Sequence, residues 1–282
     1  MAQEQRPATP LEQRALARWS SWGALPAVFD EDRADWAAER ATLRDLLDDV
    51  AWREASRTTI NAHYTDPAYV SEMWRLVQGL GFTEGRVLEP GAGSGTFIGM
   101  APEGAAMTGV ELDSTTAAIA AAPYPHANVR SESFADTRLP AGYFDAAIGN
   151  VPFAKVVLHD PKHNAGGHSI HNHFIIKSLA MTRPGGVVAV LTSSFTMDTA
   201  NPAARREMNG MADLIGAVRL PNGAHRRAAG TEVVTDLLVF RRREPGVAPA
   251  SIDWEHVAAR GVGDDGVKMN AHWDPRPDHI HG

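Results

Sequence analysis

Apolar and polar positions follow two different rhythms along the 282-residue chain, and the rhythm changes near residue 58. Before that point apolar residues recur at helical spacing, first from Leu11 to Trp19 and again over about Asp32–Trp52. Residues 1–57 are therefore predicted to be a helical extension. The apolar side of its second helix is predicted to hold Trp36, Leu43, Leu46, Leu47 and Val50, with Trp19 and Trp22 as further packing residues.

From about residue 59, short apolar runs alternate with helical stretches. This alternation predicts an α/β fold with a mostly parallel sheet covered by helices on both faces. The last two runs are joined by residues 221–232 without a clear helix, which predicts an antiparallel last strand. Seven strands are expected, over residues 86–88, 107–110, 129–132, 143–148, 187–191, 215–220 and 235–240, with helices over 116–122 and 174–181.

Residues 244–282 return to a composition rich in Pro, Gly and Asp, which predicts an irregular C-terminal tail or linker. The stretch from His272 to Pro277 is expected to pack poorly unless something outside the domain receives it. The pattern thus divides the chain into a helical extension over 1–57, an α/β domain over 58–243 and a tail over 244–282.

Composition narrows the class of protein. Hydrophobic residues make up 44% and charged residues 22%, as in ordinary soluble proteins, and the absence of cysteine excludes disulfides and a thiol nucleophile. No apolar run approaches the roughly 18 residues that span a bilayer, and the first residues lack the apolar core of a signal peptide. We therefore expect no membrane association and a cytoplasmic protein.

The net charge of −7 argues against a basic surface for nonspecific nucleic-acid binding. Three small arginine clusters, at 205–206, 226–227 and 241–243, leave local contacts with phosphate groups open. Solvated helix ends are the competing explanation for each cluster.

A glycine-rich turn follows the first predicted strand. Residues 90–95 read Pro-Gly-Ala-Gly-Ser-Gly, and a backbone with few side chains lets a ligand approach closely. Glu111 ends the next strand, where its two oxygens can bind both hydroxyls of a ribose. The spacing is G-x-G-x-G and not G-x-G-x-x-G, and the carboxylate of Glu89 would repel a pyrophosphate but suit the amino end of a methionine. The pattern favours S-adenosylmethionine over NAD.

The tetrapeptide Asn150-Val151-Pro152-Phe153 follows the fourth predicted strand. Asn150 offers a hydrogen-bond acceptor, Pro152 stiffens the loop, and Phe153 adds a flat apolar face. Such a site can hold a planar base and accept hydrogen bonds from its exocyclic amine. Asn and Pro are also common in ordinary turns, so the glycine turn upstream carries the functional interpretation.

Residues 58–243 resemble the class I, S-adenosylmethionine-dependent N6-adenine DNA methyltransferases, with the motif order of the gamma group. The tetrapeptide is similar to the catalytic motif of that family. Three further segments resemble its cofactor motifs: His63-Tyr64-Thr65-Asp66-Pro67, Glu89 to Gly95, and Glu111-Leu112-Asp113. Over Trp19–Phe29, Asn150–Asn164 and Met197–Glu232, the chain is similar to the methylase part of large phage and plasmid helicase-methylase proteins.

This resemblance implies a Rossmann-like fold, S-adenosylmethionine as cofactor and DNA as partner. It implies methyl transfer to adenine N6 after base flipping, in a phage, plasmid, restriction-modification or defence context, with a possible helicase or specificity partner. The implied catalytic residues are Asn150, Val151, Pro152 and Phe153. The implied cofactor-binding residues are His63, Tyr64, Thr65, Pro67, Glu89, Pro90, Gly91, Ala92, Gly93, Glu111, Leu112, Ser133 and Phe134.

Two positions depart from the family pattern. Val151 stands where the family usually has Pro, and we expect its backbone carbonyl to act as the second acceptor. Ser133-Phe134 stands where Asp-Phe is common, so either Ser133 or Asp136 is expected at the adenine amine. Methylation of RNA or of a protein glutamine, and a catalytically silent cofactor-binding subunit, remain open as alternatives.

Five histidines crowd the stretch after the tetrapeptide, and their spacing would suit a transition metal. No cysteine accompanies them, so no metal is predicted. A substrate-facing loop is favoured, with His171 and His173 entering the helix that starts near residue 174. These residues are His159, His163, His168, His171 and His173.

Overall fold

Seven strands form one sheet in the order β3-β2-β1-β4-β5-β7-β6. The computed structural model describes residues 8–16, 19, 22–59, 65–222, 224, 234–260 and 267–281. The strands are β1 (Gly85–Pro90), β2 (Ala105–Glu111), β3 (Asn128–Ser131), β4 (Phe144–Asn150), β5 (Thr182–Ser193), β6 (Ala212–Arg219) and β7 (Thr235–Arg242).

Strand β7 is antiparallel to both β5 and β6, whereas β1 to β5 pair in parallel. The predicted seven-stranded α/β fold and its antiparallel last strand are therefore confirmed, and every predicted strand overlaps an observed one. The chain moves outward from β1 to β3 and then returns to place β4 on the other side of β1. Ligands in open α/β sheets bind at such a switch point, beyond the carboxyl ends of the strands.

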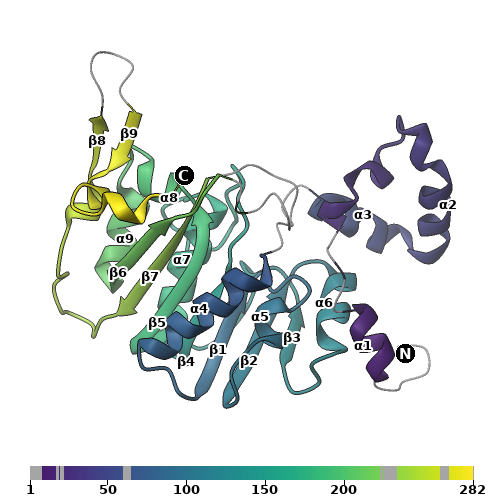
Figure 1. Ribbon diagram of the computed structural model, residues 1–282, viewed down its shortest axis with the longest axis horizontal. Helices are drawn as coiled ribbons and strands as arrows, with labels where there is room; N and C mark the ends of the chain where they lie inside the picture. The colour runs from purple at the N-terminus through teal and green to yellow at the C-terminus, as the bar shows by residue number, and fades with distance from the viewer. Residues whose placement is uncertain are drawn as a thin grey trace.

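Helices cover both faces of the sheet (Figure 1). On one face, α4 (Pro67–Gly79) and α5 (Thr96–Gly99) bury Trp74 and Phe97 against strand residues such as Val87. On the other, α7 (Ile170–Met181) and α9 (Ala203–Met211) pack over Leu88 and its neighbours. Consecutive strand residues point to opposite faces of the sheet. The runs of buried residues in β1 and β5 therefore pack into the hydrophobic cores on both faces.

The N-terminal extension is helical, but its second predicted helix is two helices. Its elements are α1 (Pro10–Leu16), three 3₁₀ turns, η1 (Trp22–Ala24), η2 (Pro26–Phe29) and η3 (Ala34–Trp36), then α2 (Ala37–Leu46) and α3 (Asp49–Thr58). Leu47 is extended, and the side chain of Asp48 accepts hydrogen bonds from the backbone N–H groups of residues 50 and 51, which starts a new helix.

The break at Leu47 also changes which residues are buried. Leu46 is 75% exposed and Val50 55% exposed, so the predicted packing face is wrong at these two positions. Trp22 and Trp52 are buried instead, in a chain of ring contacts through Phe29. The rings of Trp19 and Trp22 also meet edge to face, which agrees with the packing role predicted for them.

The prediction of an irregular, poorly packed tail over 244–282 is wrong. This segment forms η4 (Asp253–Glu255), the antiparallel strands β8 (Val257–Arg260) and β9 (Val267–Asn270), η5 (Ala271–Trp273) and η6 (Pro277–His279). Helix α6 (Ser114–Ala121) lies elsewhere, between β2 and β3. Trp254 and Trp273 are 3% and 1% exposed and join the core beneath α9 and α8 (Phe195–Asp198). The side chain of Asn270 donates to the carbonyl oxygens of residues 197 and 254, which fixes the segment to α8. The domain boundaries at 57 and 243 stay a prediction.

Candidate functional site

The switch point brings the glycine turn and the tetrapeptide together. Glu89 lies next to the end of β1 and Asn150 ends the neighbouring β4. A Cβ atom placed on Gly91 would lie 3.7 Å from Pro152 Cδ and 3.9 Å from the carbonyl oxygen of Asn150. One placed on Gly149 would lie 3.6 Å from Glu89 Cγ. Two motifs some 60 residues apart in sequence therefore form one site at the carboxyl edge of the sheet.

The glycine turn needs its glycines. Gly91, Gly93 and Gly95 have φ values of 77°, 53° and 80°, a region that side chains disfavour. The backbone N–H groups of Gly91 and Ala92 both donate to the carbonyl oxygen of Val110, at 2.9 and 2.8 Å. The turn is thereby tied to β2 before it enters α5.

Two carboxylates flank the turn, a buried one at Glu89 and a half-buried one at Glu111. Glu89 is 2% exposed, and its Oε2 has no hydrogen-bond partner in the described part of the chain. Burial, reinforced by the nearby charge of Glu111, raises the pKa of Glu89 well above its usual range. A buried, incompletely satisfied carboxylate calls for a cationic or hydrogen-bond-donating ligand.

Glu111 is held in place by backbone donors. Its Oε1 accepts from Asp113 N and its Oε2 from Gly93 N, both at 2.9 Å. Burial still raises the pKa of Glu111, although these two bonds oppose the increase. The carboxylate is thus oriented beside the glycine turn, in the place where the sequence predicts ribose binding.

The remaining predicted cofactor residues surround this edge. Thr65 is buried, Pro67 is the first residue of α4, and Leu112 is 60% exposed next to Glu111. The Ser133 Oγ accepts from Ala135 N at 3.3 Å, and the Phe134 ring packs on Phe174 with 4.8 Å between ring centroids. His63 and Tyr64 lie outside the described residues. A cofactor contact stays a prediction for each of these residues.

In the tetrapeptide, the backbone of Val151 is fixed by the neighbouring strand. Its N–H donates to the carbonyl oxygen of Leu191 in β5 at 3.0 Å, and its side chain is 1% exposed. Pro152 and Phe153 are half-buried, and Phe153 packs against the edge of the core. The acceptor role of the Val151 carbonyl stays a prediction.

The histidine stretch is arranged by packing and hydrogen bonds. His168 Nε2 lies 2.8 Å from Glu207 Oε2, and His171 Nε2 lies 2.9 Å from Ser169 Oγ. His171 and His173 belong to α7, so both lie in the helix as predicted, and both are buried; burial lowers the pKa of His171 to about 4. Over the described ranges, no three His, Asp or Glu side chains gather in a group suited to a metal ion.

The arginine clusters mostly anchor the fold. Arg205 is 1% exposed and donates to the carbonyl oxygens of Thr196 and Glu255. Arg241 donates to backbone carbonyls near the amino ends of the parallel strands, and Arg243 pairs with Asp213 at 2.7 Å. These residues are not free to bind DNA, which corrects the phosphate-contact interpretation for them. Arg226 and Arg227 lie outside the described residues.

Sequence reasoning missed two groups of residues around the site. A buried ion pair joins Asp160 to Lys177, and the N-terminal extension reaches the segment after Glu111. In that second contact, Trp22 Nε1 donates to Asp113 Oδ1 at 3.3 Å and Ser114 Oγ donates to Glu54 Oε2 at 2.6 Å. A lysine among apolar residues of a predicted helix was the available signal for the ion pair.

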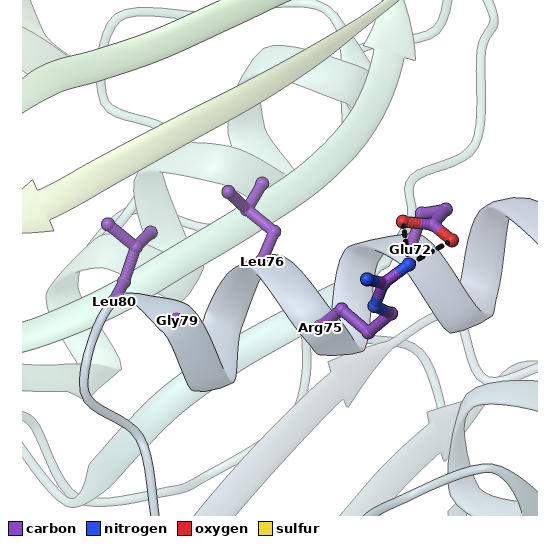
Figure 2. Close-up of a pocket in the computed structure, with 5 residues that line it drawn as sticks. All are labelled: Glu72, Arg75, Leu76, Gly79 and Leu80. Atoms are coloured by element: carbon purple, nitrogen blue, oxygen red, sulfur yellow. Dashed lines mark hydrogen bonds and ion pairs between the residues drawn. The ribbon is translucent and has the colours of Figure 1, made fainter.

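A depression on the surface lies away from this site. It follows the outer side of α4 toward its C-terminal end (Figure 2) and is lined by Glu72, Arg75, Leu76, Gly79 and Leu80. That end of α4 leads into β1, so the depression lies near the amino ends of the strands. The ion pair between Arg75 and Glu72 rests on its rim. Within the described ranges, no helix has both the length and the apolar character to cross a bilayer.

Comparison with solved structures decides the fold. The chain superposes on a putative class I S-adenosylmethionine-dependent methyltransferase from Listeria monocytogenes with a TM-score of 0.52 and 15% identity, over 66% of this chain and 61% of that one. This is the class I methyltransferase fold. A modification subunit of a putative type I restriction enzyme from Vibrio vulnificus shares it, with a TM-score of 0.54 and 19% identity over 73% of this chain and 48% of that chain.

Two curated proteins are similar to this chain in sequence. It is 28% identical to Defense against restriction protein B of Escherichia phage P1 over 195 residues, 67% of this chain and 9% of that protein. It is 30% identical to the type II methyltransferase M.XamI of Xanthomonas campestris pv. amaranthicola over 238 residues, 74% of this chain and 43% of that protein. The chain spans less than half the length of either relative. No protein-family model matches the sequence.

Proposed function

We propose that this chain is an S-adenosylmethionine-dependent DNA methyltransferase that modifies adenine N6, in a restriction-modification or defence context. The observation that carries the proposal is the meeting of Glu89 and the glycine turn with the Asn150 tetrapeptide at the switch point of a class I methyltransferase fold. The names of the two curated relatives, a type II methyltransferase and a protein of defence against restriction, support DNA as the substrate.

The residues around the edge fit the proposed cofactor. Glu89 Oε2, which has no hydrogen-bond partner among the described residues, would accept from the ammonium group. Glu111 would accept from the ribose hydroxyls once it exchanges its bond to Gly93. Thr65 and Pro67, with His63 and Tyr64, would border the methionine end. Leu112, Ser133 and Phe134 would border the adenine, with Pro90, Gly91, Ala92 and Gly93 giving the backbone room that the cofactor needs. When bound, the cofactor supplies an activated methyl group on its sulfonium.

The tetrapeptide would prepare the target amine. The exocyclic nitrogen of adenine is a poor nucleophile because its lone pair is delocalised into the ring. Asn150 Oδ1 and the Val151 carbonyl would accept hydrogen bonds from its two N–H groups and stabilise the positive charge that develops on nitrogen. Phe153 would stack on the base after it leaves the duplex, with Pro152 keeping the loop rigid. Positioning against the methyl group supplies much of the remaining acceleration.

A label-transfer experiment tests this proposal. Purified protein is incubated with tritiated S-adenosylmethionine and, separately, unmethylated DNA, RNA or protein. Label is expected in DNA alone. Nucleoside analysis by mass spectrometry is expected to show N6-methyldeoxyadenosine. Label in RNA or protein only would favour the alternative substrates, and cofactor binding without transfer to any of them would favour a silent subunit that serves a helicase or specificity partner.

The Asn150→Ala variant tests the role of the tetrapeptide. Loss of the side-chain acceptor should abolish methyl transfer while calorimetry shows nearly normal S-adenosylmethionine affinity, because Asn150 acts on the target amine. Asn128→Ala is the matched control, since Asn128 is exposed at the first residue of β3, on the edge of the sheet. Wild-type methylation by Asn150→Ala would refute the assignment.

A further inference from the structure

A buried ion pair joins α7 to the loop that follows the tetrapeptide. Lys177 Nζ donates to Asp160 Oδ2 at 2.8 Å, and the side chains are 0% and 1% exposed. His173 Nε2 lies 3.1 Å from the same carboxylate oxygen. Burial alone would raise the pKa of Asp160, but hydrogen bonds with Lys177 and His173 outweigh it and hold that pKa below its usual range. The carboxylate is therefore ionised at neutral pH.

The same lysine reaches the other side of the site. Its ammonium group also donates to the carbonyl oxygen of Ala135 at 2.9 Å and lies 5.1 Å from the centre of the Phe134 ring. These two residues belong to the segment predicted to border the cofactor adenine. Lys177 thus holds the adenine side and, through Asp160, the loop that follows the tetrapeptide.

Asp160 in turn shapes that loop. Its Oδ1 and its carbonyl oxygen both accept from His163 N, and its carbonyl also accepts from Asn164 N at 2.7 Å. The Asn164 side chain then bonds the backbone at residues 158 and 168. Residues 155–157, between the tetrapeptide and this ordered turn, are exposed at the carboxyl edge. The ion pair therefore fixes one end of the surface that a substrate strand would meet.

Burial of two charges is a poor way to add stability, because the loss of hydration offsets most of their attraction. Apolar residues of similar size often stabilise a core as well. What an ion pair adds is a defined distance and direction between the segments it joins. A misplacement of about 1 Å can lower the rate of methyl transfer about 100-fold, so a fixed distance between the two segments favours the reaction.

We propose that Asp160 and Lys177 are a positioning pair, which sets the loop after the tetrapeptide against the Phe134–Ala135 segment so that target amine and cofactor align. This rests on the proposed methyltransferase function. Neither residue touches the reacting atoms, so their removal should lower kcat and leave S-adenosylmethionine affinity close to normal.

The test replaces both charges at once. In the double variant Asp160→Leu, Lys177→Met, no charge is stranded in the core, and its unfolding midpoint is expected within a few degrees of the wild type. At saturating DNA and cofactor, kcat is expected to fall at least 10-fold, with the cofactor Kd changed less than threefold. The matched control is Glu72→Leu, Arg75→Met, which removes an exposed ion pair from α4. If the folded double variant has the kcat of the wild type, the pair does not position the site and the proposal is refuted.

A second measurement does not require activity. Hydrogen exchange of the Asp160→Asn variant, kept below its unfolding midpoint, should show faster exchange in both residues 158–168 and residues 133–137, with β1 and β5 unchanged. An increase confined to one of the two segments would overturn the coupling. If the wild type transfers no label to DNA, the proposed function fails, whereas this exchange pattern still decides whether the pair joins the two segments.

Discussion

Two carboxylates are buried in this molecule to nearly the same extent, and they behave in opposite ways. Glu89, at the end of β1, has an oxygen without a partner in the described part of the chain, and its pKa is raised. Asp160 has a lysine, a histidine and backbone donors around it, and its pKa is lowered. The protein completes one environment itself and leaves the other for a ligand.

The difference shows that the hydrogen-bond partners of a buried carboxylate indicate whether it stabilises the fold or is available to bind a ligand. A paired buried carboxylate is part of the fold, and removing its partner destabilises the protein. A carboxylate that is buried but incompletely paired costs stability until a cation binds, and such groups concentrate at functional sites. Substitutions at the two positions should therefore affect different measurements.

The largest effect is expected from Lys177→Met. This substitution leaves the Asp160 charge buried without its lysine, and breaking a buried pair in this way costs about 3–5 kcal/mol. Urea denaturation followed by circular dichroism measures the free energy of unfolding. A loss under 1 kcal/mol would show that the two carboxylates do not differ as described.

Glu89→Gln should produce the reverse pattern. Loss of the charge that faces the cofactor ammonium should weaken S-adenosylmethionine binding by about 10- to 100-fold, the size of a charge-assisted hydrogen bond of about 1.5–3 kcal/mol. Thermal stability of the free protein should stay equal or rise, because the amide avoids the cost of a buried charge. Calorimetry and thermal unfolding of the same preparation measure both quantities; unchanged affinity would contradict the role given to Glu89.

The raised pKa of Glu89 predicts a pH effect of defined sign. Below that pKa the free protein carries a proton that the cofactor ammonium must displace, so affinity should fall as pH is lowered, by up to about tenfold per unit. Titrations between pH 5 and 7 avoid the cofactor's own amino group, which titrates at about 7.7–8.0. Proton release on binding, measured in two buffers, should vanish in Glu89→Gln. Proton uptake in the wild type would reverse the assignment.

The smallest effect is expected from Glu72→Gln on the rim of the α4 depression. The side chains of Glu72 and Arg75 are 66% and 72% exposed, and exposed pairs contribute a few tenths of a kcal/mol at most sites. Unfolding and cofactor affinity should both match the wild type within error. A change in affinity would mean that α4 communicates with the site, and the contrast between Glu89 and Asp160 would no longer be local.

The sequence predicts the sheet and the cofactor edge well because their signals are local. Buried parallel strands appear as apolar runs, and the glycine turn carries its backbone requirement in its own residues. Gly91, Glu89 and Glu111 could therefore be placed at strand ends without coordinates. The break before α3 also has a local signal in Asp48, but apolar residues continue at helical spacing across it and conceal the break.

Contacts between distant segments could not be predicted in this way. Nothing near Asp160 indicates that a lysine 17 residues later will meet it, and the Pro- and Gly-rich composition around Trp254 and Trp273 hides how well their rings fit beneath α9. Arg205 likewise gives no local sign that it ends inside the fold with backbone carbonyls as partners. Shape complementarity in three dimensions decides these cases.

The buried tryptophans of the C-terminal segment have a consequence for the order of folding. Trp273 closes the same core as α8 and β6, more than 50 residues earlier in the chain, and Arg219 lies 5.0 Å from its ring. During synthesis, the part of this core that Trp273 fills stays incomplete until residue 273 has left the ribosome. Such long-range closure slows folding and leaves apolar strand surface open to aggregation in the interval. A segment made later in synthesis thus completes the core against which the earlier strands pack.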